Sequence, residues 1–133
     1  MKNILSILII TCLAQLILAQ GDDTRYFSAD YTFEKGRTEV MYGNNVVLRA
    51  DQNPTSKALD TLKIGDPVTI IKKGETTSDL NGQASYWYKV KTKNKTGYVL
   101  GGWISLDHRE VNGKTFLVIY AMRDNQLYAR TRV

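Results

Sequence analysis

The pattern that most constrains this chain begins at Thr38, where short runs rich in Val, Ile, Thr and Tyr alternate with clusters of Gly, Asn, Asp and Lys. Residues of the first kind favour strands, and those of the second tolerate the backbone angles of tight turns. No later stretch of helical length repeats its apolar residues with a helical period. The candidate strands are residues 38–42, 46–49, 58–62, 67–73, 85–91, 97–100, 103–106, 115–121 and 126–132. This pattern predicts an all-β fold.

The usable length limits the fold to one small core. The chain has 133 residues, and its first 19 hold 14 of the apolar ones, which leaves about 114 residues with a net charge of about +4. A chain of that size is too short for the larger barrels and doubly wound enzyme folds. The short strands must bury a common face and avoid exposed sheet edges, which a small, strongly bent β-barrel does. We therefore expect a small β-barrel.

The N-terminus has the pattern of a secretory signal peptide. Lys2 supplies a positive charge, residues 4–18 form an apolar run, and Ala19 is a small residue at a suitable cleavage position. We expect residues 1–19 to be removed and the product to be exported, periplasmic or secreted, with no stable membrane span afterwards. The alternative is a retained membrane anchor, although about 15 apolar-rich residues fall short of the roughly 20 that span a bilayer.

Few residues that carry catalytic or metal chemistry would remain after cleavage. Cys12, the only cysteine, leaves with the apolar run, which excludes a thiol nucleophile, a zinc–cysteine site and a redox CxxC pair. His108, the only histidine, sits in the charged run 106–110, which we interpret as an exposed linker. A lone histidine without a legible partner makes a poor general base, and no calcium-loop pattern is present. We therefore expect no enzyme activity, no metal and no cofactor.

Residues 20–37 separate the apolar run from the first strand. They begin polar and acidic at residues 21–23. They then carry four aromatic residues without an apolar period: Tyr26, Phe27, Tyr31 and Phe33. We interpret this segment as a linker that becomes partly ordered.

Five pieces of sequence occur in an order that resembles the bacterial SH3-like (SH3b) domain family. They are NVVLRADQNP at residues 45–54, ALDTL with KIGD at 58–66, VTII at 68–71, YWYKV at 86–90 with KTGYV at 95–99, and WIS at 103–105. The resemblance covers about residues 40–106 and implies an SH3-like β-barrel, which we place at residues 38–106. Residues 107–133 would then form an additional C-terminal β-hairpin. Segment 74–84 is longer and more polar than a minimal loop of the family.

SH3-type domains generally hold extended ligands in a shallow groove of aromatic rings, and the resemblance implies such a groove here. The expected ligand-binding residues are Tyr42, Trp87, Lys89, Tyr98 and Trp103. Aromatic rings offer a rigid apolar platform, and indole or phenol groups also bond a polar backbone. A peptide or glycan strand suits such a surface.

Strand alternation bears on whether these side chains are exposed. In residues 85–91 it sets Trp87 on the face opposite Val90, so Trp87 points outward if Val90 points into the core. An outward indole would mark an interaction site. The alternative is a Trp87 covered by segment 74–84 or by the C-terminal strands, and for Tyr98 the alternative is core packing.

Lysines at alternate positions predict a basic ridge along one hairpin: Lys89, Lys91, Lys93 and Lys95. Such a ridge attracts anionic envelope polymers at low salt. The alternative is a solvated hairpin tip whose lysines only add solubility. No nucleic-acid motif accompanies the ridge, so nucleic acid is not an expected partner.

The expected function is that of an exported, non-catalytic binding module for peptide or glycan elements of the bacterial cell envelope. The alternative is a structural or adaptor protein that docks a protein partner, such as an envelope protein, through its C-terminal strands. In residues 115–121 both faces are apolar, since Phe116 and Val118 alternate with Leu117 and Ile119. If the barrel covers one face, a partner or a second copy would cover the other.

Overall fold

The computed structural model describes residues 25–133, so the predicted signal peptide at residues 1–19 lies outside the described part of the chain. The elements are β1 (Arg25–Tyr26), α2 (Phe27–Asp30), β2 (Thr38–Val40), β3 (Val46–Arg49), β4 (Ala58–Leu62), β5 (Pro67–Leu80), β6 (Gln83–Lys91), β7 (Thr96–Leu100), the 3₁₀ turn η1 (Gly101–Trp103), β8 (Asp107–Val111), β9 (Lys114–Arg123) and β10 (Gln126–Arg132). Nearly all of this regular structure is strand, which confirms the predicted all-β class.

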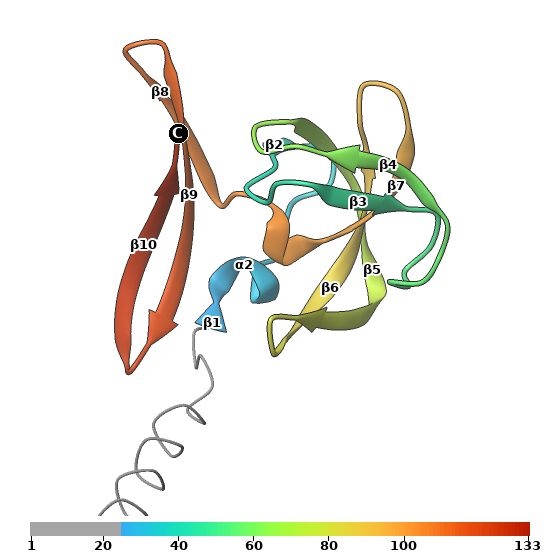
Figure 1. Cartoon of the computed structure of the whole chain (residues 1–133), viewed down its shortest axis with the longest axis horizontal. Helices are drawn as coiled ribbons and strands as arrows, with labels where there is room; N and C mark the ends of the chain where they lie inside the picture. Colours follow the sequence, from blue (N-terminus) through green and yellow to red (C-terminus); the bar gives the residue numbers. More distant parts are fainter. Residues whose placement is uncertain (1–24) are drawn as a thin grey trace, which may run out of the picture.

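Strands β2 to β7 form one six-stranded sheet that curls into a small barrel, as Figure 1 shows. The strand order is β2-β5-β6-β7-β3-β4, and neighbouring strands are antiparallel. The curl turns one face inward. The buried side chains that fill it are Phe33, Met41, Val46, Leu48, Leu62, Val68, Ile70, Tyr88, Val90, Val99 and Ile104. This architecture agrees with the SH3-like barrel expected from the sequence.

A buried tyrosine ties the segment before β2 to this core. Tyr88 of β6 is fully buried, and its ring meets that of Phe33 edge to face with centroids 5.3 Å apart. The Tyr88 hydroxyl donates to the carbonyl of Tyr31 (3.0 Å) and accepts the N–H of Phe33 (3.3 Å). The segment interpreted from sequence as a partly ordered linker therefore supplies part of the barrel core.

The β5–β6 hairpin is longer than the strand pattern predicts. Residues 74–84, expected to form a long polar loop, belong mostly to the two strands, and only Asn81 and Gly82 make the turn. Both turn residues have positive φ, 51° and 86°, which Asn and Gly adopt most readily. A shift in register between Lys73 and Thr77 separates this distal half from the part that belongs to the barrel.

A side chain from the β3–β4 loop holds this irregular point of β5. The side-chain oxygen Oε1 of Gln52 accepts the backbone N–H groups of Glu75 (2.9 Å) and Thr76 (3.1 Å). Gly74 permits the close approach of Gln52 on one side and of β6 on the other, because a Cβ atom at this position would lie 2.7 Å from the carbonyl oxygen of Trp87 and closer still to Gln52 Oε1. The β3–β4 loop and the bent hairpin are therefore held together.

The C-terminal extension forms a second antiparallel sheet rather than a lone hairpin. β9 pairs with β10 along one edge and with β8 and β1 along the other. The charged run 106–110, interpreted from sequence as an exposed linker, is mostly β8, because an exposed edge strand needs only its backbone to pair. Residues 103–106, predicted as a strand, contain instead the end of η1 and an isolated bridge at Ile104. The chain turns here at Gly102, whose N–H donates to Ser85 Oγ (3.0 Å).

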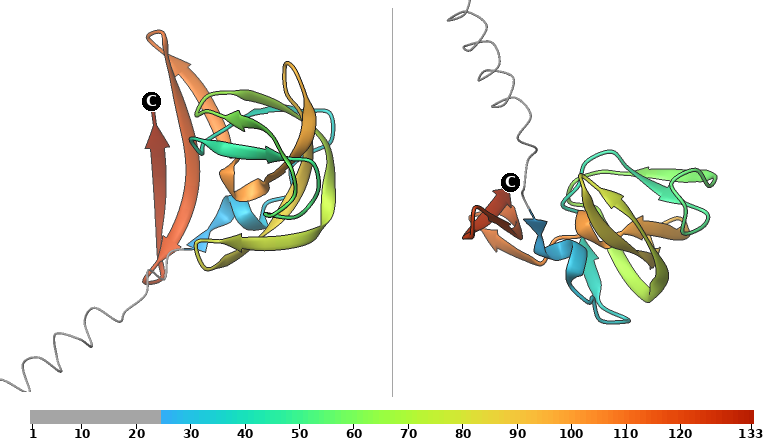
Figure 2. Two further views of the ribbon diagram at one scale, coloured as in Figure 1. Left: turned by 45° about the vertical axis from the view of Figure 1, so that its right-hand side comes forward. Right: turned by 90° about the horizontal axis from the view of Figure 1, so that it is seen from below.

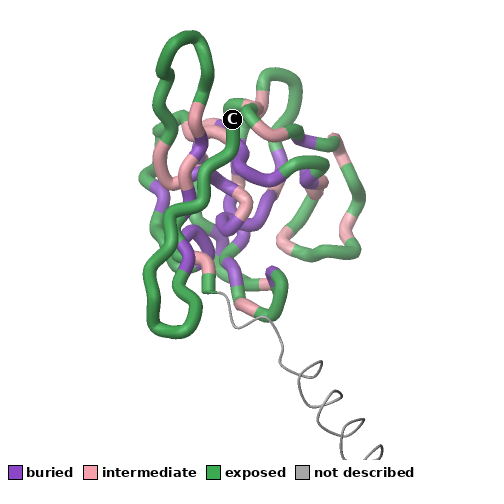
Figure 3. The backbone as a smooth tube through the Cα atoms, turned by 60° about the vertical axis from the view of Figure 1, so that its left-hand side comes forward, coloured by how far each residue is buried: buried purple, intermediate pink, exposed green. Residues whose placement is uncertain are grey.

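The second sheet packs one of its faces against the barrel, with α2 beside both (Figure 2). Leu117 and Ile119 of β9 are buried in a cluster with Tyr42. Ser105 Oγ links the end of the barrel to β9 by accepting the N–H of Val118 (3.2 Å). All of β10 is exposed, as the burial colouring of Figure 3 shows. The extra strands therefore cover one side of the barrel and leave the other face of their own sheet open.

Tyr88→Phe is expected to lower the free energy of unfolding by about 1–3 kcal/mol, because it removes the partner of two buried backbone groups. Chemical denaturation of the folded protein measures this change. The matched control is Tyr86→Phe, two residues away on the same strand and 38% exposed, which should change stability by less than about 0.5 kcal/mol. Equal stability of the two variants would contradict the role assigned to Tyr88.

The same tyrosine predicts a pH dependence. Burial raises the pKa of the Tyr88 phenol above its ordinary value of 10.0. The unfolded chain therefore releases this proton first, and the stabilisation is complete below pH 10 and is lost as the pH rises through the folded pKa. We expect the stability difference between wild type and Tyr88→Phe to shrink above pH 10. A difference that stays constant to pH 12 would contradict this linkage.

Candidate functional site

A hollow of about 220 Å³ lies on the outer side of the barrel, between β3, the β3–β4 loop and Trp103 at the end of η1. Its lining is mainly apolar, with two asparagines and one arginine among the polar members. The lining residues are Asn44, Asn45, Val46, Val47, Arg49, Pro54, Trp87, Leu100 and Trp103. We call this hollow the indole groove, because both tryptophans of the described chain contribute to it.

Trp87 lies on the face that strand alternation predicts but is not exposed there, which corrects one expectation. Tyr88 and Val90 point into the core, and Trp87 points to the opposite face, where it pairs across the strands with Leu100. Only 3% of its surface is accessible, because it packs in a cluster with Ala29 of α2, Leu80 of β5 and Leu100 of β7. Its indole N–H also donates to a side chain of the β5–β6 hairpin, Ser78 Oγ (2.8 Å). Trp87 is therefore covered in part by segment 74–84, and it also belongs to the lining of the indole groove.

Trp103 is the half-buried indole of the groove, and the chain before β3 holds it in place. Its carbonyl oxygen accepts the N–H groups of Tyr42 (2.8 Å) and Gly43 (3.0 Å). A Cβ atom on Gly43 would lie 2.8 Å from the Trp103 ring and 2.6 Å from Val46, so the ring rests directly on the backbone. The side chain is thus both accessible and fixed in orientation.

Tyr42 does not line the indole groove, contrary to the expectation from the sequence. It is 6% exposed and lies beneath the second sheet, in the cluster with Leu117 and Ile119. The guanidinium of Arg132 sits 4.7 Å from its ring centroid. The physical reason is the C-terminal extension, whose apolar face needs cover and takes Tyr42 as part of it.

Lys89 and Tyr98 lie beside the groove rather than in it. They are directly opposite each other on β6 and β7, and both are half-buried. Tyr98 is also opposite Arg49, which does line the groove. Tyr98 packs against the cluster that contains Trp87, as the alternative interpretation of its role expected.

Sequence reasoning missed the contribution of β3 to the groove. Val46 and Leu48 point into the core, so alternation turns Val47 and Arg49 outward. Arg49 Nη1 then donates to the carbonyl of Ser56 (2.9 Å), which fixes the loop that carries Pro54. The alternation was visible in the printed sequence, but nothing there showed that the outer face of β3 would be hollowed.

His108 and Glu39 are titratable groups near the junction of the barrel and the second sheet. His108 is exposed on β8, and its backbone N–H bonds to the Asp107 carboxylate (2.9 Å). Burial raises the pKa of the Glu39 carboxyl, against the lowering effect of Arg37 and His108. Within residues 25–133, no group of three or more His, Cys, Asp or Glu side chains is placed to hold a metal ion. The same residues include no helix with the length and apolarity needed to cross a membrane.

Comparison with known proteins supports the architecture. Residues 44–105 match the family model of the bacterial SH3 domain, and this range contains every residue of the indole groove. No curated protein sequence and no solved structure matches the chain. The family match coincides with the five sequence pieces and with strands β3 to β7 of the barrel. The match to the bacterial SH3 domain therefore covers residues 44–105 of the chain.

Proposed function

We propose that this chain is an exported, non-catalytic binding module that holds peptide or glycan elements of the bacterial cell envelope in the indole groove. The observation that carries the proposal is the position of Trp103, whose accessible ring is fixed at the side of an apolar groove. Bacterial SH3 domains are generally binding modules, which agrees with a groove that contains no catalytic group. Export rests on the signal-peptide pattern of residues 1–19.

The composition of the groove suits an extended, partly polar ligand. Val47, Leu100 and the Trp103 indole offer apolar surface, while Asn44 and Asn45 bring amide groups to the same hollow. Rings and aliphatic side chains bind the flat parts of a chain, and amides bond to its carbonyl or hydroxyl groups. Burial of one ring contributes about 1.5–3 kcal/mol, so a single accessible indole supports weak to moderate affinity.

The predicted lysine ridge adds little to this site. Lys91 and Lys93 are exposed, whereas Lys89 is half-buried and the ammonium group of Lys95 donates to the carbonyl of Leu59. The four lysines therefore do not form one free row. We expect them to contribute general attraction for anionic polymers rather than specific contacts.

Retention on purified peptidoglycan tests the groove. Trp103→Ala and Val47→Gln are expected to reduce retention at least about tenfold, because each removes apolar contact surface from the ligand. Trp87 is left intact, since its burial makes its truncation a stability change. Val111→Gln is the matched control, because Val111 is 50% exposed on β8, away from the groove, and should bind as wild type does.

Thermal unfolding of each variant separates lost binding from lost structure. Val47 is half-buried, so Val47→Gln should keep the fold even if Trp103→Ala loosens the contact with Gly43. If Val47→Gln and Trp103→Ala both fold and are both retained as well as wild type, the indole groove is not the binding site. Wild type that is not retained at all would refute the choice of ligand.

The outer face of the second sheet favours a second candidate function, that of an adaptor for a protein partner. The barrel covers one face of the second sheet, while the other face exposes Tyr120 (39%), Met122 (36%) and Leu127 (65%) beside half-buried Phe116 and Val118. In the described part of the chain, no strand pairs with the outer edge of β10. An adaptor that receives an extended segment of a protein partner on β10 would use both features.

Light scattering and co-purification test this adaptor function. The candidate predicts a captured protein partner whose recovery falls at least about tenfold in Leu127→Glu, because a charge on the exposed face opposes burial. Lys114→Glu, on the exposed tip of the same sheet, is the control and should capture normally. A strictly monomeric protein with no captured partner would rule out this second function.

A further inference from the structure

A second hollow, of about 170 Å³, lies between the barrel and the C-terminal sheet. Its polar and aromatic lining comes from Tyr26, Tyr42, Asn81, Trp103, Arg130 and Arg132. Trp103 also lines the indole groove, so the two hollows share this residue. Arg130 and Arg132 belong to β10 and therefore lie outside the range that matches the bacterial SH3 domain. We call this hollow the arginine pocket.

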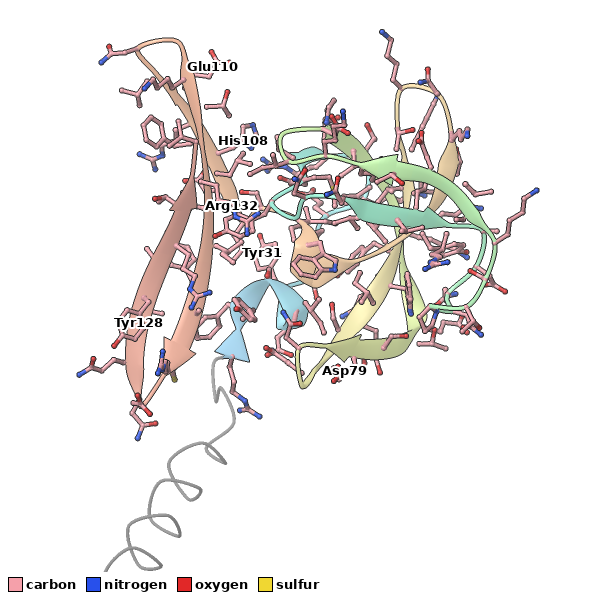
Figure 4. All side chains as sticks on the ribbon, viewed as in Figure 1. Tyr31, Asp79, His108, Glu110, Tyr128 and Arg132 are labelled. Atoms are coloured by element: carbon pink, nitrogen blue, oxygen red, sulfur yellow. The ribbon has the colours of Figure 1, made fainter. Side chains whose placement is uncertain are left out.

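The strand register aims both arginines at the barrel. Arg130 lies opposite Ile119 and Arg132 lies opposite Leu117, and these two partners are buried against the barrel. Residues opposite each other in an antiparallel pair share a face, so both guanidinium groups are on the inner side of the sheet. Figure 4 shows Arg132 in the space between β10 and the barrel.

Aromatic groups hold each guanidinium in position without neutralising it. Arg130 Nη1 donates to the Tyr26 hydroxyl (3.0 Å), and its guanidinium lies 5.5 Å from that ring. Arg132 Nη1 donates to the Tyr42 carbonyl (3.1 Å), and its guanidinium lies 4.7 Å from the Tyr42 ring. Each contact uses one of five N–H donors. Most donors of both groups are thus left for a ligand.

Neither arginine has a carboxylate partner in the described part of the chain. The ion pairs there involve three other arginines: Arg37 with Glu39, Arg109 with Asp107, and Arg123 with Asp124. Arg130 and Arg132 lie two positions apart on one face of β10, so their two positive charges act together on an anion that enters the pocket.

We propose that the arginine pocket binds a carboxylate of a peptide whose body lies in the indole groove, which makes the ligand of the proposed function an acidic peptide element. This inference rests on the proposed function. Guanidinium groups match the two oxygens of a carboxylate in a planar, bidentate geometry, and rings beside the charges reduce their solvation. Trp103 lines both hollows, so a ligand long enough to pass this side chain would contact the apolar and the charged surface.

The test compares retention on intact peptidoglycan with retention on peptidoglycan whose carboxylates have been converted to neutral amides by carbodiimide and ethanolamine. Wild type should be retained about tenfold less on the blocked material. The double variant Arg130→Gln, Arg132→Gln should be retained on both materials at the level that wild type shows on the blocked material. The matched control is Arg109→Gln, Arg123→Gln, which removes the same charge from the same sheet outside the pocket and should behave as wild type.

The outcomes separate this inference from the proposed function. Equal wild-type retention on intact and blocked material overturns the carboxylate assignment and leaves the groove function standing. Failure of wild type to bind either material overturns both. Displacement of wild type by sodium phosphate, but not by sodium chloride of equal ionic strength, assigns the pocket to a phosphate and overturns the carboxylate. If the double glutamine variant unfolds in a thermal scan, the two wild-type retentions alone decide between these results.

Discussion

The fixed position of Trp103 is the constraint on which the surface of this molecule depends. Its carbonyl accepts two backbone N–H groups from Tyr42 and Gly43, and its ring lies on the backbone of Gly43, where no larger residue fits. The indole is therefore oriented before any ligand arrives, which lowers the entropic cost of binding. Trp103 lines both hollows, so its position affects the shape of each.

The C-terminal extension changes what the barrel presents. The apolar face of β9 packs against the barrel, and this contact buries Tyr42, which is therefore absent from the outer surface. The same sheet places Arg130 and Arg132 of β10 in one hollow with Trp103. The expected site therefore loses Tyr42 from the indole groove, and two cationic side chains lie near its remaining exposed indole.

Several features were predictable from the sequence because they depend on local pattern. The strand runs and turn residues predicted the all-β class, and alternation correctly set Trp87 on the face opposite Val90. The burial of Trp87 was not predictable, because it depends on Ala29 and Leu80, which are distant in sequence or lie in a polar segment and meet the indole only in the folded chain. The sequence also did not predict that the charged residues of β8 form a strand paired with β9, because an exposed edge strand has no alternation of apolar residues.

The central claim is that Trp103, and not the buried Trp87, meets the ligand. The two indole N–H groups give separate signals in a ¹H–¹⁵N spectrum, and soluble peptidoglycan fragments can be titrated into the labelled protein. The signal of Trp103 should shift with increasing ligand, while that of Trp87 should stay in place because its N–H is bonded to Ser78. Saturable binding that leaves the Trp103 signal unmoved would contradict the account.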